Sequence, residues 1–272
     1  MGIVKIGNRN ENIFITLNWK KDYMLEEYGY EPMFVSLFGS QNYGLDNEKS
    51  DMDIRAIVFP TLNDLIFNEG VVSKVEKYSD GEVDIKDIKT YVGLLKRGNP
   101  TYIESLFSPY QINHLSGLED AKVIVEEYSD VMVKDFMYSA LGTISSKYKH
   151  MYKCDKKNEE HDYNGKDLSH MFRVYDLMNQ VADGSNLAHL NFRIENRALR
   201  ELALSSKEYR MTDELAKSHS KIIYDDSEKL LNNFVNGLEN NPKRKKDMDE
   251  DFKNLVYNAI YGDIYRCWEQ VY

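Results

Sequence analysis

The sequence is poor in cysteine and proline and has no long apolar run. Its 272 residues include 2 cysteines, Cys154 and Cys267, and 5 prolines. So few cysteines exclude a disulfide framework and a multi-cysteine zinc site, and they are typical of a reducing compartment. No stretch approaches the roughly 18 uninterrupted apolar residues of a membrane helix, and the N-terminus has no signal-peptide core. We therefore expect a cytoplasmic protein with neither a disulfide nor a membrane partner.

The chain also lacks an excess of positive charge. Its 35 Lys and Arg stand against 45 Asp and Glu, which gives a formal net charge of -10. This balance disfavours a broad, nonspecific nucleic-acid surface, although it leaves room for a local basic groove. Hydrophobic residues make up 42% and charged residues 29% of the chain, as in ordinary globular proteins. The length suits one large domain or two modest ones.

The stretch 34–58 organises the rest of the sequence. An apolar run over 34–38 predicts a buried strand that stops at Gly39 and Ser40, and a second apolar run over 54–59 predicts the next strand. A glycine lets the backbone approach a ligand closely. The amide N–H groups and the hydroxyl of this turn are the usual equipment for holding a phosphate oxygen.

Two aspartates, Asp51 and Asp53, stand at the head of the second predicted strand. Strand side chains alternate, so both carboxylates and Arg55 fall on one face. Two carboxylates on one face repel each other unless a cation lies between them. Hard oxygen ligands of this kind favour Mg²⁺ or Mn²⁺, which also bind triphosphates. A Gly-Ser turn or an Asp-x-Asp pair alone is an ordinary surface feature, and it is their combination between two strands that predicts a nucleotide site.

The string Phe38-Gly39-Ser40, ten further residues, then Asp51-Met52-Asp53-Ile54 resembles the signature of the DNA polymerase beta-like nucleotidyltransferase superfamily. The segments 98–109 and 166–178 resemble those of its predicted members from bacteria and their phages. The resemblance implies an α+β fold, with a small mixed sheet and flanking helices followed by an all-helical C-terminal domain. It also implies transfer of a nucleoside monophosphate from a triphosphate, with ATP expected, to an acceptor hydroxyl.

The superfamily completes its metal site with a third carboxylate from a neighbouring strand. Residues 82–85 alternate as a strand, which makes Asp84 the predicted third carboxylate and Glu82, on the same face, the alternative. Two solvated charges on an exposed strand would give the same pattern. The resemblance thus implies that Asp51, Asp53 and Asp84 are catalytic and hold two Mg²⁺ ions.

A second group of candidate binding residues lies on the helix predicted over 165–183. Lys166, His170 and Arg173 share one of its faces. Such a row could neutralise the β and γ phosphates of a nucleotide held across a cleft from the aspartates, and the family resemblance implies this binding role. A solvated basic face would show the same spacing.

The segment 98–109 contains a helix junction. Gly98 ends one helix, Asn99 can cap the next, and proline fits its first turn. We expect Asn99 and Glu104 to brace this junction rather than touch the substrate, because capping alone explains the order of the residues.

From residue 118 onward the pattern is helical almost throughout. We predict a catalytic domain over 1–115 and, over 116–272, a helical bundle that closes the nucleotide cleft. Two long amphipathic helices, 211–238 and 248–268, are expected to pack together, joined by a basic loop over 241–246. The remaining pattern predicts helices over 18–28, 118–128 and 133–152, strands over 71–78 and 82–85, a turn at 60–64 and a mobile charged loop over 153–164.

A further helix is predicted over 191–204. Its Arg193, Arg197 and Arg200 recur every three or four residues, which is typical of a nucleic-acid-facing surface. Acidic neighbours at 195 and 201 make a salt-bridged, solvated face an equal alternative.

The acceptor is the least determined part of the prediction. We rank an RNA end, of the tRNA-like kind, slightly ahead of a small molecule or a protein side chain. A silent nucleotide-binding or nucleotide-sequestering protein is the alternative from another class, and the paired aspartates disfavour it because binding alone does not require them.

Overall fold

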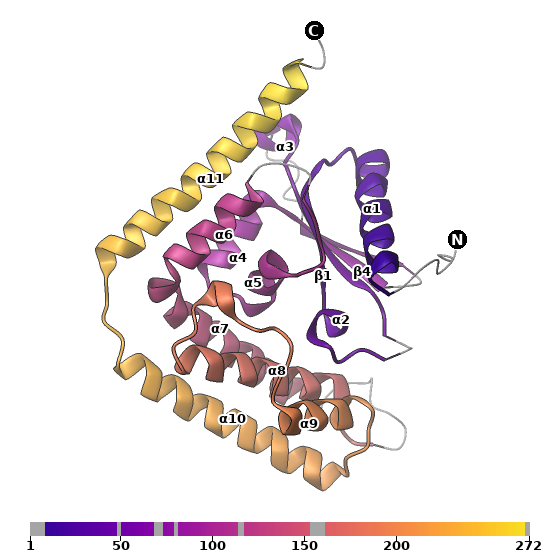
Figure 1. The fold of residues 1–272 in the computed structure, drawn as a ribbon, viewed down its shortest axis with the longest axis vertical. Helices are drawn as coiled ribbons and strands as arrows, with labels where there is room; N and C mark the ends of the chain where they lie inside the picture. The colour runs from indigo at the N-terminus through magenta and orange to yellow at the C-terminus, as the bar shows by residue number, and fades with distance from the viewer. Residues whose placement is uncertain are drawn as a thin grey trace.

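A five-stranded mixed sheet occupies the N-terminal part of the chain, and helices make up most of the rest (Figure 1). The computed structural model describes residues 9–47, 50–67, 73–78, 81–113, 117–152 and 161–269. This arrangement confirms the predicted α+β class with a helical C-terminal region.

The sheet has the strand order β3-β4-β2-β1-β5. The pair β2 and β4 is parallel, and the other three pairs are antiparallel. Both predicted strands of the central motif are therefore confirmed as neighbours. The strands are β1 (Pro32–Phe38), β2 (Asp53–Val58), β3 (Ser73–Tyr78), β4 (Gly81–Asp87) and β5 (Gln111–Asn113).

The helices surround this sheet and extend well beyond it (Figure 1). They are α1 (Arg9–Tyr28), α2 (Ser40–Tyr43), α3 (Leu62–Phe67), α4 (Ile88–Lys96), α5 (Pro100–Phe107), α6 (Leu118–Glu127), α7 (Ser129–His150), α8 (Gly165–Ala182), the 3-10 helix η1 (Leu187–His189), α9 (Arg197–Lys207), α10 (Asp213–Asn236) and α11 (Pro242–Glu269).

The two faces of the sheet carry different apolar clusters, because strand side chains alternate. Ile54 and Ala56 of β2 pack with α1, whereas Ile57 joins the larger core on the side of α4 and α5. Arg55 follows the same alternation and points toward that second side, where it contacts Thr101 of α5. This face of the sheet therefore presents polar groups to the helical part of the chain.

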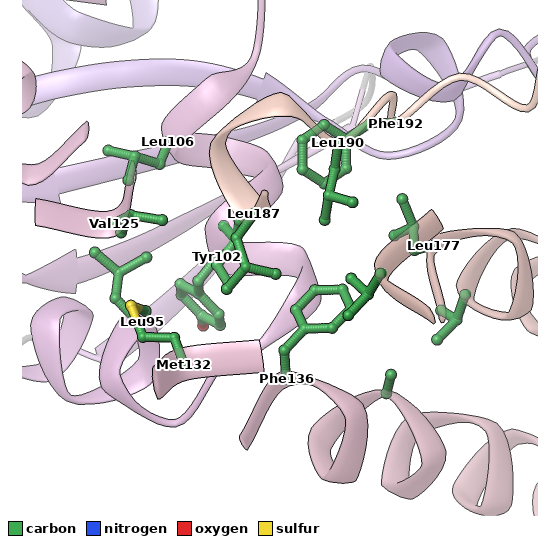
Figure 2. Close-up of a cluster of buried hydrophobic side chains, with 14 of the residues drawn as sticks. Leu95, Tyr102, Leu106, Val125, Met132, Phe136, Leu177, Leu187, Leu190 and Phe192 are labelled. Carbon is green, nitrogen blue, oxygen red and sulfur yellow. The ribbon is translucent and has the colours of Figure 1, made fainter. Parts of the chain in front are cut away.

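One continuous core joins the sheet to the helices (Figure 2). It runs from β1 through α5, α6 and α7 to α8 and η1, so the two predicted domains share a single apolar interior. Burial of this surface is the main stabilising contribution to the fold. The side chains labelled in Figure 2 are Leu95, Tyr102, Leu106, Val125, Met132, Phe136, Leu177, Leu187, Leu190 and Phe192.

The helix predicted over 191–204 begins later than expected, at Arg197. The side chain of Asn196 accepts a hydrogen bond from the backbone of Leu199 (3.1 Å) and so caps the N-terminus of α9. The prediction missed this cap. As a result Arg193 lies on the segment before α9 and not on the helix.

The basic segment 241–246 was predicted as a loop, and this prediction is wrong. It forms the first turns of α11, which begins at Pro242, a residue suited to a first helical turn. Asn241 accepts a hydrogen bond from the backbone of Arg244 (3.0 Å) and caps the helix. The predicted pairing of the two long helices is also wrong, since α10 packs on α7 and α8 while α11 packs on α4 and α6 (Figure 1).

Two smaller differences concern the N-terminal part. The predicted turn at 60–64 contains the start of α3, where Thr61 and Asp64 bond reciprocally to each other's backbone N–H groups (2.8 and 3.1 Å). Helix α1 begins nine residues before the predicted start, at Arg9. The predicted loop 153–164 lies outside the described residues up to 160, as do residues 71 and 72 of the third strand.

Within the described ranges, no helix is both long and apolar enough to span a membrane.

Because both parts of the chain share this core, we expect substitutions within it to lower the stability of the whole protein. Phe136 is 0% exposed and Tyr138, on the same helix, is 51% exposed. We expect Phe136→Ala to lower the free energy of unfolding by about 3–5 kcal/mol through lost burial and a cavity. Tyr138→Ala should change it by less than about 0.5 kcal/mol. Urea titration measures both, and equal losses would contradict the assigned core.

Candidate active site

A tight turn joins β1 to α2 and sets the position of one aspartate. The register of β1 and β2 pairs Phe38 with Asp53. Gly39 has φ 84°, in the left-handed region, and a Cβ built on it would lie 2.6 Å from Asp53 Oδ2. Only glycine allows both this backbone angle and this approach. The turn that begins at Gly39 therefore lies in direct contact with the carboxylate.

The turn and the aspartates open into a cavity of about 490 Å³ between the sheet and the helical part of the chain. Nearly all of the sequence-predicted site residues meet there. Gly39, Ser40, Asp51 and Asp53 line one part, and Lys166, His170 and Arg173 of α8 line another. The remaining lining residues are Phe38, Tyr43, Leu45, Asn47, Ser50, Arg55, Thr101, Ser169 and Lys207.

Negative charge concentrates around Asp53. Burial, followed by the nearby charges of Glu82 and Asp51, raises the pKa of Asp53 from 3.8 to about 6. The charges of Lys166 and Lys207 act in the opposite direction. The carboxylates of the sheet thus repel one another and attract the cations of the helices across the cavity.

The two candidates for a third carboxylate lie in different surroundings. The parallel register pairs Ile54 with Val83, which places Glu82 alongside Asp53 and Asp84 alongside Arg55. Neither Glu82 nor Asp84 is among the described residues that line the cavity, so the distinction between them rests on their neighbours. The structure therefore brings Glu82 near the aspartates, and it gives Asp84 a different set of partners.

Those partners are two cations and a phenol. Asp84 Oδ2 forms an ion pair with Arg55 Nη2 (3.0 Å), and Asp84 Oδ1 lies 2.6 Å from Lys86 Nζ. The hydroxyl of Tyr102 also donates to Asp84 Oδ2 (3.2 Å). Asp84 is thereby charge-compensated, and it holds the guanidinium of Arg55 between the rings of Phe38 and Tyr102.

Arg173 is the most deeply buried cation of the site. It is 1% exposed, its Nη1 donates to Glu104 Oε2 (3.2 Å), and its guanidinium carbon lies 3.7 Å from the ring centroid of Tyr43. Its buried Nε has no hydrogen-bond partner among the described residues. The side chain as a whole lines the cavity, and the Glu104 carboxylate compensates its charge.

Glu104 links the two parts of the site. It is 0% exposed and accepts hydrogen bonds from Asn42 Nδ2 (2.8 Å) as well as from Arg173. Asn42 belongs to α2, directly after the turn, so Glu104 ties that turn to α8. Burial raises the pKa of Glu104, and the charge of Arg173 opposes this shift. Asn99 caps α5 as predicted, by accepting a hydrogen bond from the backbone of Thr101 (3.1 Å), whereas Glu104 braces α2 against α8 and not the helix junction itself.

His170 differs from the other members of its row in charge. Burial, then the charges of Arg173 and Lys147, lowers its pKa well below 6.5, so the imidazole is neutral near pH 7. Its Nε2 lies 3.5 Å from Arg173 Nη2. The charged members of the predicted row are therefore Lys166 and Arg173, and His170 contributes hydrogen-bonding capacity.

Lys207, at the C-terminus of α9, was not among the site residues predicted from the sequence. Its Nζ donates to Leu45 O (2.7 Å) and to Ser50 Oγ (3.2 Å), on the segment that leads to Asp51. Burial and the charge of Lys166 lower the pKa of Lys207. The sequence did contain one indication of this site residue. Lys207 lies seven residues after Arg200, and that spacing places both cations on one helix face.

A close backbone contact brings Lys166 and Lys207 together. A Cβ built on Gly165 would lie 2.1 Å from the carbonyl oxygen of Ser206. Helices α8 and α9 can therefore touch at this point only because residue 165 is glycine. The next residue of each segment is one of the two lysines, and both side chains reach the cavity.

The glycine-serine turn, the paired aspartates and the cations of α8 all fall within residues 22–256, which match the profile of the RNA repair pathway DNA polymerase beta family. The chain belongs to this family. This membership agrees with the resemblance to DNA polymerase beta-like nucleotidyltransferases that the motif carries. A comparison with curated proteins gives no match.

The pKa of Asp53 predicts a pH-dependent effect on stability. The folded-state pKa of about 6 lies above the ordinary 3.8, so the folded protein binds this proton more tightly than the unfolded chain. The stabilisation is complete below about pH 4 and is lost as the pH rises through about 6. We expect Asp53→Asn, measured in EDTA, to raise the free energy of unfolding by about 1–2 kcal/mol at about pH 7, a figure reduced for solvent screening.

Near about pH 4 the same substitution should have almost no effect, because Asp53 is then already protonated. Thermal or urea unfolding at both pH values tests this. Asp22→Asn, at an exposed carboxylate on α1, serves as the control and should change little at either pH. A gain that does not depend on pH would contradict the charge repulsion assigned to Asp53.

The buried ion pair predicts a second effect. Glu104→Gln leaves Arg173 buried without a counter-charge, so we expect the free energy of unfolding to fall by about 3–5 kcal/mol. Glu119→Gln is the matched control, because the Glu119 side chain is 70% exposed in its pair with Lys122. It should cost less than about 1 kcal/mol. The bracing role would be refuted if the two variants were equally stable.

Proposed function

We propose that the protein transfers a nucleoside monophosphate from a nucleoside triphosphate, with ATP expected, to a hydroxyl at an RNA end. One observation carries this proposal, namely the single cavity in which Asp51 and Asp53 face Lys166, Arg173 and Lys207. Carboxylates on one wall and cations on the other match a triphosphate and its divalent cation. The family description supports RNA as the acceptor.

The carboxylates suit a hard divalent cation such as Mg²⁺ or Mn²⁺. The raised pKa of Asp53 reflects negative charge from Glu82 and Asp51 that a bound cation would offset. Among the described residues, no three His, Cys, Asp or Glu side chains are already arranged to hold a metal ion. Mg²⁺ is commonly held by one or two carboxylates, with substrate phosphates and water completing its shell. We propose Asp51 and Asp53 as the ligands.

Glu82 is the third carboxylate that we propose, in place of Asp84. Its support is the electrostatic coupling to Asp53 across neighbouring strands. Asp84 already neutralises Arg55 and Lys86, so recruiting it would deprive two cations of this counter-charge. We assign Asp84 the task of positioning Arg55 against the cavity wall.

The triphosphate is held in this proposal from two sides. Gly39 and Ser40 offer amide N–H groups and a hydroxyl from the sheet side. Lys166, Lys207 and Arg173 offer positive charge from the helical side. The neutral imidazole of His170 would add a hydrogen bond without a charge. These groups orient the α-phosphorus for in-line attack.

When bound, the divalent cation would stabilise charge on the phosphates and lower the pKa of the acceptor hydroxyl. The acceptor hydroxyl releases its proton to solvent and its oxygen forms a bond to the α-phosphorus, while the α–β phosphoanhydride bond breaks and pyrophosphate leaves. Asp51 is exposed while Asp53 is partly buried, so the acceptor is expected to enter from the side of Asp51.

The proposal is tested by incubating the protein with α-labelled ATP, Mg²⁺ and RNA. We expect label on the RNA, and we expect Asp51→Asn or Asp53→Asn to reduce transfer by more than about a hundredfold, because outer partners of metal ligands alone are worth ten- to a hundredfold. Glu82→Gln should reduce transfer without loss of stability. Asp84→Asn should lower stability first, since it unpairs Arg55.

Asp22→Asn is the matched carboxylate control and should retain full transfer. Label on the protein or on a small molecule of a cell extract would replace RNA with another acceptor. ATP that is bound but not turned over would identify a silent nucleotide-binding protein. Full transfer by both aspartate variants would refute the assignment of the site.

A further inference from the structure

Three exposed arginines lie outside the cavity and have no part in the proposed reaction. They are Arg193, just before α9, and Arg197 and Arg200, on its first turns. We call these three residues the arginine rim. The chain as a whole has a net charge of -10, so a run of exposed cations stands out against it.

The arginine rim borders the cavity. Arg200 Nη2 donates to Gly44 O (2.9 Å), and a Cβ built on Gly44 would lie 3.0 Å from Arg193 Nε. The neighbours of Gly44 on both sides, Tyr43 and Leu45, line the cavity. Figure 1 shows α9 below α2, beside the segment that follows it. A polymeric ligand that leaves the cavity on this side therefore crosses the arginine rim.

The acidic neighbours of the rim form no ion pair with it among the described residues. Glu201 forms an ion pair with Arg210 (3.0 Å), and Arg210 also pairs with Glu208 (2.9 Å). In the described part of the chain, no carboxylate lies within ion-pair distance of Arg193, Arg197 or Arg200. The alternative of a salt-bridged, solvated face therefore does not describe these three residues.

We propose that the arginine rim binds the phosphodiester backbone of the acceptor RNA, next to the end that enters the cavity. This inference rests on the proposed function for the identity of the acceptor. Guanidinium groups bind phosphate oxygens in pairs and keep their charge at any physiological pH. Contacts to phosphates position a strand and do not read its bases. Binding at the rim should therefore tolerate changes of RNA sequence.

The test is the salt dependence of RNA binding. The probe is a short, fluorescein-labelled single-stranded RNA, and binding is followed by fluorescence anisotropy in the Asp53→Asn background so that no transfer occurs. Each phosphate contact to a single strand contributes about 0.7 to the slope of log K against log salt. Replacing all three arginines by Gln should lower the slope by about 2 and weaken binding about a hundredfold near 0.1 M salt.

Arg210→Gln is the matched control, because this arginine lies just beyond the same helix and is paired with carboxylates. It should leave both the slope and the affinity unchanged. Arg197→Glu alone keeps the test independent of folding, since Arg197 is exposed and its side chain forms no hydrogen bond or ion pair among the described residues. This variant should weaken binding at least about fivefold. ATP affinity, measured in parallel, should be the same in all rim variants.

The inference is overturned if the triple variant binds RNA as tightly as the Asp53→Asn protein from which it is made, or if that Asp53→Asn protein does not bind RNA at all. It is also overturned if Arg210→Gln weakens RNA binding as much as the triple substitution does. It stands if RNA binding depends on the rim even when the wild-type protein releases no pyrophosphate from ATP and RNA. That last result would reject the proposed reaction while keeping the binding surface, so the two failures are distinguishable.

Discussion

The buried ion pair between Glu104 and Arg173 is the interaction on which the rest of the site depends. It crosses from the sheet part of the chain to the helical part, and both side chains are almost wholly removed from water. Through Asn42, the same carboxylate also fixes the helix that follows the glycine-serine turn. A buried pair of this kind adds little net stability, but it allows few other arrangements, because either charge alone is costly. It therefore holds the carboxylate wall and the cationic wall in one relative position.

That position leaves the site under electrostatic strain. Asp53 is held against Gly39 and close to like charges, while Lys166 and Lys207 are brought together by a contact that only Gly165 permits. Like charges gathered on each wall cost stability in the empty protein, and binding of a charged ligand relieves that cost. A triphosphate with its divalent cation relieves both walls at once. The same reasoning explains why Asp84, already compensated by Arg55, is poorly suited to be a ligand.

Much of the fold and most of the candidate site residues could be predicted from the sequence, for physical reasons that differ from one element to the next. The strands on either side of Gly39 and Asp53 are predicted by short apolar runs and by the alternation of apolar and polar residues. Helix α8 is predicted by the helical spacing of its apolar residues. The sequence could not show that Glu82 rather than Asp84 lies beside Asp53, because both share a face and the parallel register decides between them. Lys207 was missed because its role arises from a contact between two helices. The starts of α9 and α11 were misplaced because an asparagine caps each helix.

In the proposed reaction, the two walls of the cavity hold one triphosphate between them. A crystal structure of the protein with Mg²⁺ and a non-hydrolysable ATP analogue tests it most directly. We expect phosphate groups between the Gly39 turn and the side chains of Lys166, Arg173 and Lys207, with the cation against Asp51 and Asp53. Phosphates bound elsewhere, or a cavity that stays free of nucleotide at saturating analogue, would contradict it.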